Sequence, residues 1–128
     1  MYFDKELLDK ISDCYFTVHK TLGHGFSISV YENAMMLEFA DRGIKVKKDF
    51  PMDVFYKNRP VGKFVANIVV EDTVILELKA VQKLGTDHEQ QLTSYLKATN
   101  NFVGMILNFG KDAHFRRLLN YPARDIQT

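Results

Sequence analysis

The sequence predicts a mixed domain, α/β or α+β in class, in which a central mixed sheet of about five or six strands is flanked by helices. Residues 4–22 place apolar side chains at steps of three and four, the period of an amphipathic helix. After Gly43 the apolar period changes to two, which indicates strands. A later helical stretch precedes an apolar strand, an order that allows a parallel crossover. The length of 128 residues fits one domain spanning 1–128.

The helices are delimited by capping residues and glycines. Gly23 and Gly25 end the first helix, because glycine supplies the backbone freedom that a helix C-terminus needs. Ser29 is expected to cap a second helix, with Glu32 as its capping-box partner. That helix ends before Gly43. The expected order of elements is therefore α-α-β-β-β-β-α-β, with a further short strand at the end.

The remaining elements follow from period and turn residues. A turn is expected at Asn58-Arg59-Pro60. The expected elements are strands around 44–46 and 52–56, strands 64–70 and 73–81, a helix 86–99, a buried strand 102–109 and a short strand 115–119.

Composition excludes several classes of protein. Hydrophobic residues make up 46% and charged residues 26%, which excludes a mainly disordered chain. Cys14 is the only cysteine, so neither an internal disulfide nor a cysteine-rich zinc site can form. The apolar runs are far shorter than the roughly 20 residues of a membrane span, and the N-terminus lacks an export signal. We therefore expect a cytoplasmic protein with no membrane partner.

The charges are unevenly distributed. The net charge is +1, but residues 42–63 carry seven basic and two acidic residues, giving +5 there and −4 elsewhere. Such asymmetry is typical of an anion-binding face, although a solvated hairpin surface would show the same pattern. The strand with Lys45, Lys47 and Lys48 is the candidate nucleic-acid-binding face.

The stretch 73–80 carries the clearest chemical signal. Glu77 and Lys79 lie two residues apart on a predicted strand, so their side chains leave the same face, whereas Leu76 and Leu78 fill the other. Burying two charges is costly unless they pair with each other or serve a metal or substrate. The alternative to a functional site is an ion pair near a sheet edge.

Asn67 interrupts the apolar run of the preceding strand. If residues 71–73 form a three-residue hairpin loop, Val70 pairs with Val74 and Asn67 falls opposite Glu77. A two-residue loop would place them on opposite faces. On the later helix, His88, Gln91 and Tyr95 share one stripe and could reach the same cluster. The alternatives are a hydrogen-bonded core amide at Asn67, a core Tyr95 and surface positions for the other two.

These residues resemble the GxxExxY proteins, small bacterial proteins of the PD-(D/E)xK nuclease-like superfamily. The resemblance covers residues 22–120. It is carried by Gly23-x-Gly25, Val30-Tyr31-Glu32-Asn33-Ala34, Arg42-Gly43-Ile44-Lys45-Val46, Val70-Glu71-Asp72, Glu77-Leu78-Lys79-Ala80, the segment from His88 to Thr99, and Asn108-Phe109-Gly110.

The resemblance implies a restriction-endonuclease-like core and a Mg²⁺ site. Active members hold the ion with a strand Asp and the Glu of Glu-x-Lys, often with a helix Glu, because hard Mg²⁺ prefers carboxylate oxygens. Glu77 corresponds to that Glu and Lys79 to the lysine that positions water or offsets charge. Gln91 and Tyr95 correspond to the groups that orient the phosphate or the lysine.

Two expected acids are missing. The family motif Gly-x-x-Glu-x-x-Tyr reads Gly25-x-x-Ile28-x-x-Tyr31, and the strand Asp is Asn67. With Glu77 as the only certain anion, a divalent ion should bind poorly. Glu32, one turn after Ile28, is a candidate replacement, although it also fits a capping or surface role.

Three functions remain open at this point. The first is a nuclease-like domain with a degenerate site, inactive or weakly active, which binds DNA, RNA or a protein. The second is an active Mg²⁺-dependent phosphodiesterase that uses Glu77, Lys79, Asn67 and Glu32. The third is a small homo-oligomeric interaction protein, for example a homodimer, whose contact surface is strand 102–109 and the pair Met35-Met36. The alternative for that surface is a place in the core.

Overall fold

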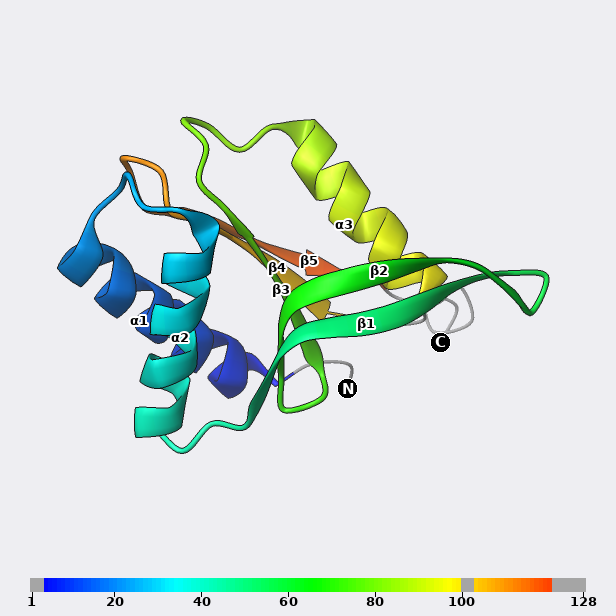
Figure 1. Cartoon of the computed structure of the whole chain (residues 1–128), viewed down its shortest axis with the longest axis horizontal. Helices are drawn as coiled ribbons and strands as arrows, with labels where there is room; N and C mark the ends of the chain where they lie inside the picture. Colours follow the sequence, from blue (N-terminus) through cyan, green and yellow to red (C-terminus); the bar gives the residue numbers. More distant parts are fainter. Residues whose placement is uncertain (1–3, 100–102, 121–128) are drawn as a thin grey trace.

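The computed structural model of the protein describes residues 4–99 and 103–120. It contains three helices and five strands in the described part of the chain (Figure 1). In chain order these are α1 (Lys5–Leu22), α2 (Ile28–Asp41), β1 (Val46–Tyr56), β2 (Arg59–Val70), β3 (Val74–Lys79), α3 (Thr86–Ala98), β4 (Val103–Asn108) and β5 (His114–Leu119).

The five strands form one mixed sheet, as the sequence predicts. Their order is β1-β2-β3-β4-β5, and every neighbouring pair is antiparallel except β3 and β4, which α3 connects by a crossover. The expected short strands at 44–46 and 52–56 are one continuous strand, β1, so three strands rather than four precede α3. The start of the expected strand 102–109 lies outside the described residues.

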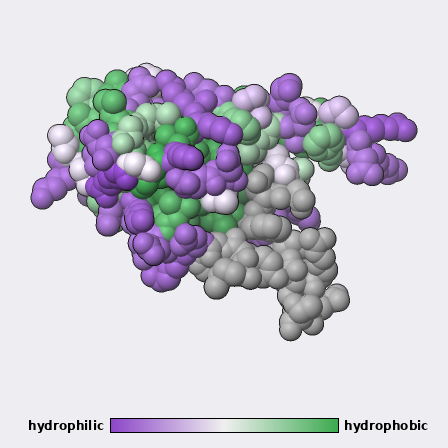
Figure 2. Space-filling model, turned by 90° about the horizontal axis from the view of Figure 1, so that it is seen from below, coloured by the Kyte–Doolittle hydropathy of each residue, from purple (hydrophilic) through white to green (hydrophobic). Residues whose placement is uncertain are grey.

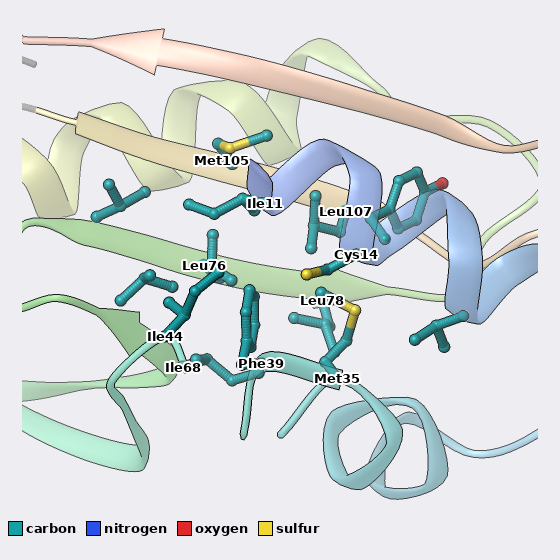
Figure 3. Close-up of a cluster of buried hydrophobic side chains, with 14 of the residues drawn as sticks. Ile11, Cys14, Met35, Phe39, Ile44, Ile68, Leu76, Leu78, Met105 and Leu107 are labelled. Atoms are coloured by element: carbon teal, nitrogen blue, oxygen red, sulfur yellow. The ribbon is translucent and has the colours of Figure 1, made fainter. Parts of the chain in front are cut away.

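Helices cover both faces of the sheet. α1 and α2 lie on one face and α3 on the other (Figure 1). Figure 3 shows the larger core, in which Ile11 of α1 and Phe39 of α2 meet Leu76 of β3 and Leu107 of β4. The smaller core packs α3 on the opposite face; its buried members are Phe64, Ala66, Val69, Ile75, Leu84, Leu92, Leu96 and Ile106.

Residues that were candidates for a dimer surface belong to this core. Met35 is fully buried and every residue of β4 is buried, whereas Met36 is half-buried. The expectation that strand 102–109 and the Met35-Met36 pair supply an exposed contact surface is therefore wrong for the residues described. Apolar side chains on a central parallel strand are covered on both faces by helices. No helix among the described residues is long and apolar enough to span a membrane.

The helix ends follow the sequence signals in one case and depart from them in another. Asp4 caps α1 by accepting a hydrogen bond from the Leu7 main chain (3.2 Å), and Gly23 ends the helix at φ +72°. The N-cap of α2 is Ser27, not Ser29, and no side-chain capping bond forms there. Ser29 is not the cap because the helix already begins at Ile28.

The β1–β2 hairpin extends well beyond the rest of the sheet (Figure 1). Its turn is Lys57-Asn58, both with left-handed φ (+50° and +62°), rather than the expected Asn58-Arg59-Pro60. Arg59 and Pro60 already belong to β2. A two-residue turn with both φ values positive matches the right-handed twist of the strands, which explains this shorter connection.

A buried amide fixes the connection between β3 and α3. The Asn108 side chain accepts a hydrogen bond from the Val81 N–H and donates one to the Val81 carbonyl, both at 2.9 Å. Asn108 is 1% exposed. Next to it, Gly110 leaves no room for a side chain, because a Cβ there would collide with the Val81 carbonyl oxygen. This close packing sets where α3 begins.

We expect Asn108→Leu to lower the free energy of unfolding by about 1–3 kcal/mol, because it leaves two main-chain groups of the half-buried Val81 without their partners. Urea unfolding followed by circular dichroism measures the change. Gln82→Leu is the matched control, since it removes an exposed amide from the same connection. Equal stabilities of the two variants would contradict this role for Asn108.

Candidate functional site

The Glu77–Lys79 strand segment faces α3, as the sequence predicts. Glu77 and Lys79 share the face of Ile75, whereas Leu76 and Leu78 belong to the core under α1 and α2. Both charged side chains are half-buried. They border a pocket of about 150 Å³ between the sheet and α3, lined by Phe64, Glu77, Lys79, His88, Gln91, Leu92, Tyr95 and Ile106.

The predicted stripe on α3 forms the other wall of this pocket. The Tyr95 ring stacks on Phe64 of β2, with centroids 4.2 Å apart and planes at 13°. Nδ1 of His88 accepts a hydrogen bond from the Gly85 main chain (3.0 Å), which orders the start of α3. Gln91 is exposed at the pocket. Phe64, which sequence reasoning did not single out, therefore helps to hold Tyr95 beside the charged strand.

The hairpin register between β2 and β3 is the three-residue-loop register. Val70 pairs with Val74, and the ladder continues to Ile68 opposite Leu76. There the paired residues end, so Asn67 is not a regular cross-strand partner of Glu77. Instead, the Asn67 side chain accepts a hydrogen bond from the Leu78 main-chain N–H (2.8 Å). This bond replaces the next bond of the ladder.

A change of strand face explains this arrangement. In β2, Ala66 contributes to the core under α3, whereas Ile68 contributes to the core under α1 and α2. Regular alternation would place both residues on one face. In β1 the pairs Lys48–Ile68 and Phe50–Ala66 flank the same point, where Asp49 has φ +49°. The two strands therefore reverse their faces together at Asp49 and Asn67.

Glu32 of α2 reaches the same region from the other side of the sheet. Its residue is 5% exposed, and its Oε2 accepts a hydrogen bond from Asn67 Nδ2 (3.1 Å). Its Oε1 lies 3.6 Å from Lys48 Nζ. Glu32 therefore takes neither the capping nor the surface position considered for it, while Ile28 packs against the core. Structure thus brings Glu32, Asn67 and Glu77 together.

The electrostatics of the cluster bring the titration of Glu77 close to neutral pH. Burial is the largest effect and raises the pKa of Glu77; the Lys79 ammonium and a hydrogen bond from the Asn67 main chain lower it, and the Glu32 carboxylate adds a smaller rise, so that the pKa is about 7. Within residues 4–99 and 103–120, Glu77 Oε1 is buried without a hydrogen-bond partner. When it is protonated, such a carboxyl group can donate a hydrogen bond as well as accept one.

The donor set does not fit Mg²⁺. The Asn67 carbonyl oxygen is turned to the Leu78 N–H and its amide N–H to Glu32, so the carbonyl is not available as a ligand in this arrangement. The Glu32 carboxylate is shared between Asn67 and Lys48. No group of three or more His, Cys, Asp or Glu side chains placed to hold a metal occurs among the described residues. Mg²⁺ prefers carboxylates and near-octahedral geometry.

Lys45, just before β1, and Lys47 and Lys48 within it do not form one basic face free of other contacts. Lys47 Nζ lies 2.9 Å from Asp72 and sits over the Phe50 ring. Lys48 Nζ donates to Asn33 (2.7 Å) in addition to its contact with Glu32. Lys45 and Lys47 border a small depression together with Glu71 and Asp72. The contact between Lys48 and Glu32 has no local sequence signal, because Lys48 follows Asn33 by 15 positions and Glu32 by 16.

This mixed sheet, with a Glu-x-Lys strand beside a crossover helix, defines a restriction-endonuclease-like nuclease fold. The chain belongs to the PD-(D/E)XK nuclease superfamily, whose family model matches residues 5–118. No curated protein sequence matches the chain.

Two solved structures show the same fold at low identity. The crystal structure of SSO0001 superposes with a TM-score of 0.57 at 10% identity, covering 77% of this chain. This chain spans 52% of the length of SSO0001. An alkaline exonuclease from Laribacter hongkongensis superposes with a TM-score of 0.54 at 10% identity, covering 99% of this chain and 76% of the exonuclease. At this identity the likeness concerns the fold.

The raised pKa of Glu77 predicts a pH-dependent stability. Its ordinary value is 4.5 and its folded value about 7, so its contribution is fully present below about pH 4.5 and is lost as the pH rises through 7. We expect wild type to lose about 1–3 kcal/mol relative to Glu77→Gln between pH 4.5 and 8. Urea unfolding across this range measures it, with Asp112→Asn as the exposed-acid control. Parallel profiles for wild type and Glu77→Gln would contradict the buried, neutral carboxyl.

Proposed function

We propose that this chain is a nucleic-acid-binding nuclease-like domain of the GxxExxY type, with a degenerate metal site and little or no phosphodiester hydrolysis. The observation that carries the proposal is the orientation of Asn67. Its amide stands where the resemblance implies an Asp, and both of its polar atoms are engaged within the protein. The position therefore contributes neither charge nor a free oxygen to a metal.

The other two acids support the same conclusion. Glu32 carries its negative charge next to Lys48 Nζ, which offsets it. Glu77 has a pKa of about 7, so a large fraction is uncharged at neutral pH. A site with so little negative charge attracts a divalent cation weakly. It also repels a phosphate group less than an intact carboxylate site would.

The pocket retains groups that suit a phosphodiester. Lys79 supplies a positive charge, and Gln91 and Tyr95 supply neutral donors on the facing helix. Protonated Glu77 can donate a hydrogen bond to a phosphate oxygen. In this proposal Lys79, Gln91 and Tyr95 bind the backbone of DNA or RNA, and Glu77 adjusts the affinity with pH.

One observation favours a second candidate, a weakly active Mg²⁺-dependent phosphodiesterase that uses Glu32 as the relocated acid. The Glu32 carboxylate lies at hydrogen-bond distance from Asn67 and close enough to Glu77 to raise its pKa. This candidate requires Mg²⁺-dependent cleavage that Glu32→Gln abolishes. Wild-type cleavage that survives Glu32→Gln would rule it out.

We expect Asn67→Asp to create metal affinity, because it adds a carboxylate beside Glu32 to the cluster that also contains Glu77. Without metal, the loss of the Nδ2 bond to Glu32 should lower the free energy of unfolding by about 1–3 kcal/mol. Mn²⁺ should restore stability by binding the folded state. Calorimetric titration with Mn²⁺ should show affinity about tenfold or more above wild type.

Asn33→Asp is the matched control, since it adds the same charge at an exposed position that already contacts Lys48. It should leave Mn²⁺ affinity close to that of wild type. Plasmid incubation with Mg²⁺ or Mn²⁺ completes the test. Millimolar or tighter metal binding by wild type, with cleavage lost in Glu77→Ala, would overturn the proposed inactive site.

A further inference from the structure

The tip of the β1–β2 hairpin exposes large apolar side chains that no core residue covers. Phe55 is 51% exposed, Tyr56 63% and Val61 62%. The hairpin projects past the body in Figure 1, and Figure 2 shows hydrophobic and hydrophilic residues interleaved along this arm. Side chains at such a projecting tip add nothing to the two cores described above. Their exposure leaves these side chains accessible to a ligand.

The charge of the tip indicates a polyanion. Between Val54 and Lys63 the sequence has three cations, Lys57, Arg59 and Lys63, and no acidic residue. Lys63 pairs with Asp53 (3.0 Å), whereas Arg59 has no ion-pair partner among the residues that the structure describes. Lys57 Nζ lies 5.4 Å from the centre of the Tyr56 ring. Aromatic rings beside such cations are typical of surfaces that bind single-stranded nucleic acid.

The backbone holds one cation at the tip in spite of a local cost. Lys57 occupies left-handed φ (+50°), a conformation that costs an ordinary L-residue about 1–2 kcal/mol and that glycine adopts freely. The register between β1 and β2 shifts at Val54/Phe55, where Val61 is the extra residue of β2. Such a bulge increases the local twist and re-aims the side chains beyond it.

Tyr56 lies on the same side of the hairpin as the candidate site. Alternation along β1 places Tyr56 on the face of Val54, which packs against the core under α3. Arg59 is the direct partner of Tyr56 and shares this face, whereas Phe55 lies on the opposite one. Along β2, the five steps from Arg59 to Phe64, which lines the pocket, span about 17 Å.

We propose that Tyr56, with Lys57 and Arg59, forms a stacking site for an unpaired base of a single-stranded nucleic acid whose backbone continues to the pocket of Lys79, Gln91 and Tyr95. The proposal rests on the proposed nucleic-acid binding and names its substrate class. An exposed ring stacks on any unpaired base, whereas base pairs in a duplex present only their edges. The neighbouring cations bind the phosphates on either side of that base.

Fluorescence anisotropy tests the site with a labelled oligothymidylate of about 20 nucleotides and a blunt duplex of equal length as probes. Tyr56→Ala should weaken oligothymidylate binding by about 5- to 100-fold. Phe55→Ala, an exposed aromatic on the other face of the same hairpin, should change it less than about twofold. Arg59→Ala should reduce the slope of log affinity against log salt concentration by the equivalent of about one phosphate contact. The control Lys20→Ala, which removes an exposed lysine of α1, should leave this slope unchanged.

A spectroscopic readout separates stacking from a general loss of charge. The chain has no tryptophan, so Tyr56→Trp introduces a single tryptophan at the tip, whose emission can be excited selectively. Oligothymidylate should quench its emission, while Leu37→Trp, at an exposed position on α2, should show no quenching. Every substituted position here is exposed, so thermal unfolding should match wild type.

The outcomes distinguish the tip from the wider proposal. If the wild type binds neither probe, both the proposed nucleic-acid binding and the proposed stacking site at the tip are overturned. Wild type that binds oligothymidylate while Tyr56→Ala binds equally well would overturn only the tip. Equal losses in Tyr56→Ala and Phe55→Ala would overturn the assignment to this face. Equal binding of the duplex, weakened equally by Tyr56→Ala, would overturn the preference for an unpaired base.

Discussion

The hydrogen bond from the Leu78 main-chain N–H to the Asn67 side chain closes the β2–β3 ladder at the point where the strands separate. A buried N–H left without a partner would cost about 1–3 kcal/mol, so the amide is needed there. Beyond this bond β2 changes face and leaves β3, and the pocket lies between Glu77, Phe64 and α3. The site depends on this one side chain for its shape.

The same amide also sets the charge of the site. It donates to Glu32, which places the α2 carboxylate close to Glu77 without any acid between them. Burial and this neighbouring carboxylate then raise the pKa of Glu77 to about 7. An Asp at position 67 would serve the ladder equally well as an acceptor, but two carboxylates would then repel each other unless a cation bound. Asn67 thus closes the ladder without adding a third carboxylate beside Glu32 and Glu77.

The face reversal at Asp49 and Asn67 has a second consequence, for the hairpin. Beyond it, Phe50, Met52 and Val54 turn toward α3, and the arm continues past the helix with Tyr56 and Arg59 on that side. A strand pair that kept its original face would turn these groups away from the pocket. The face reversal therefore places the pocket and the tip on the same side of the hairpin.

Local periodicity was sufficient to predict that Glu77 and Lys79 share a face and that His88, Gln91 and Tyr95 line one side of α3. It left open whether the loop after Val70 has two or three residues, and the structure shows the three-residue register that pairs Val70 with Val74. These features depend on residues close in sequence, where periods of two and 3.6 govern side-chain direction. Tertiary structure alone decided that Asn67 enters the ladder, that Glu32 reaches it from α2 and that Lys48 offsets Glu32. Those contacts arise where strands reverse their faces and a helix packs across the sheet, and no local period records such long-range packing.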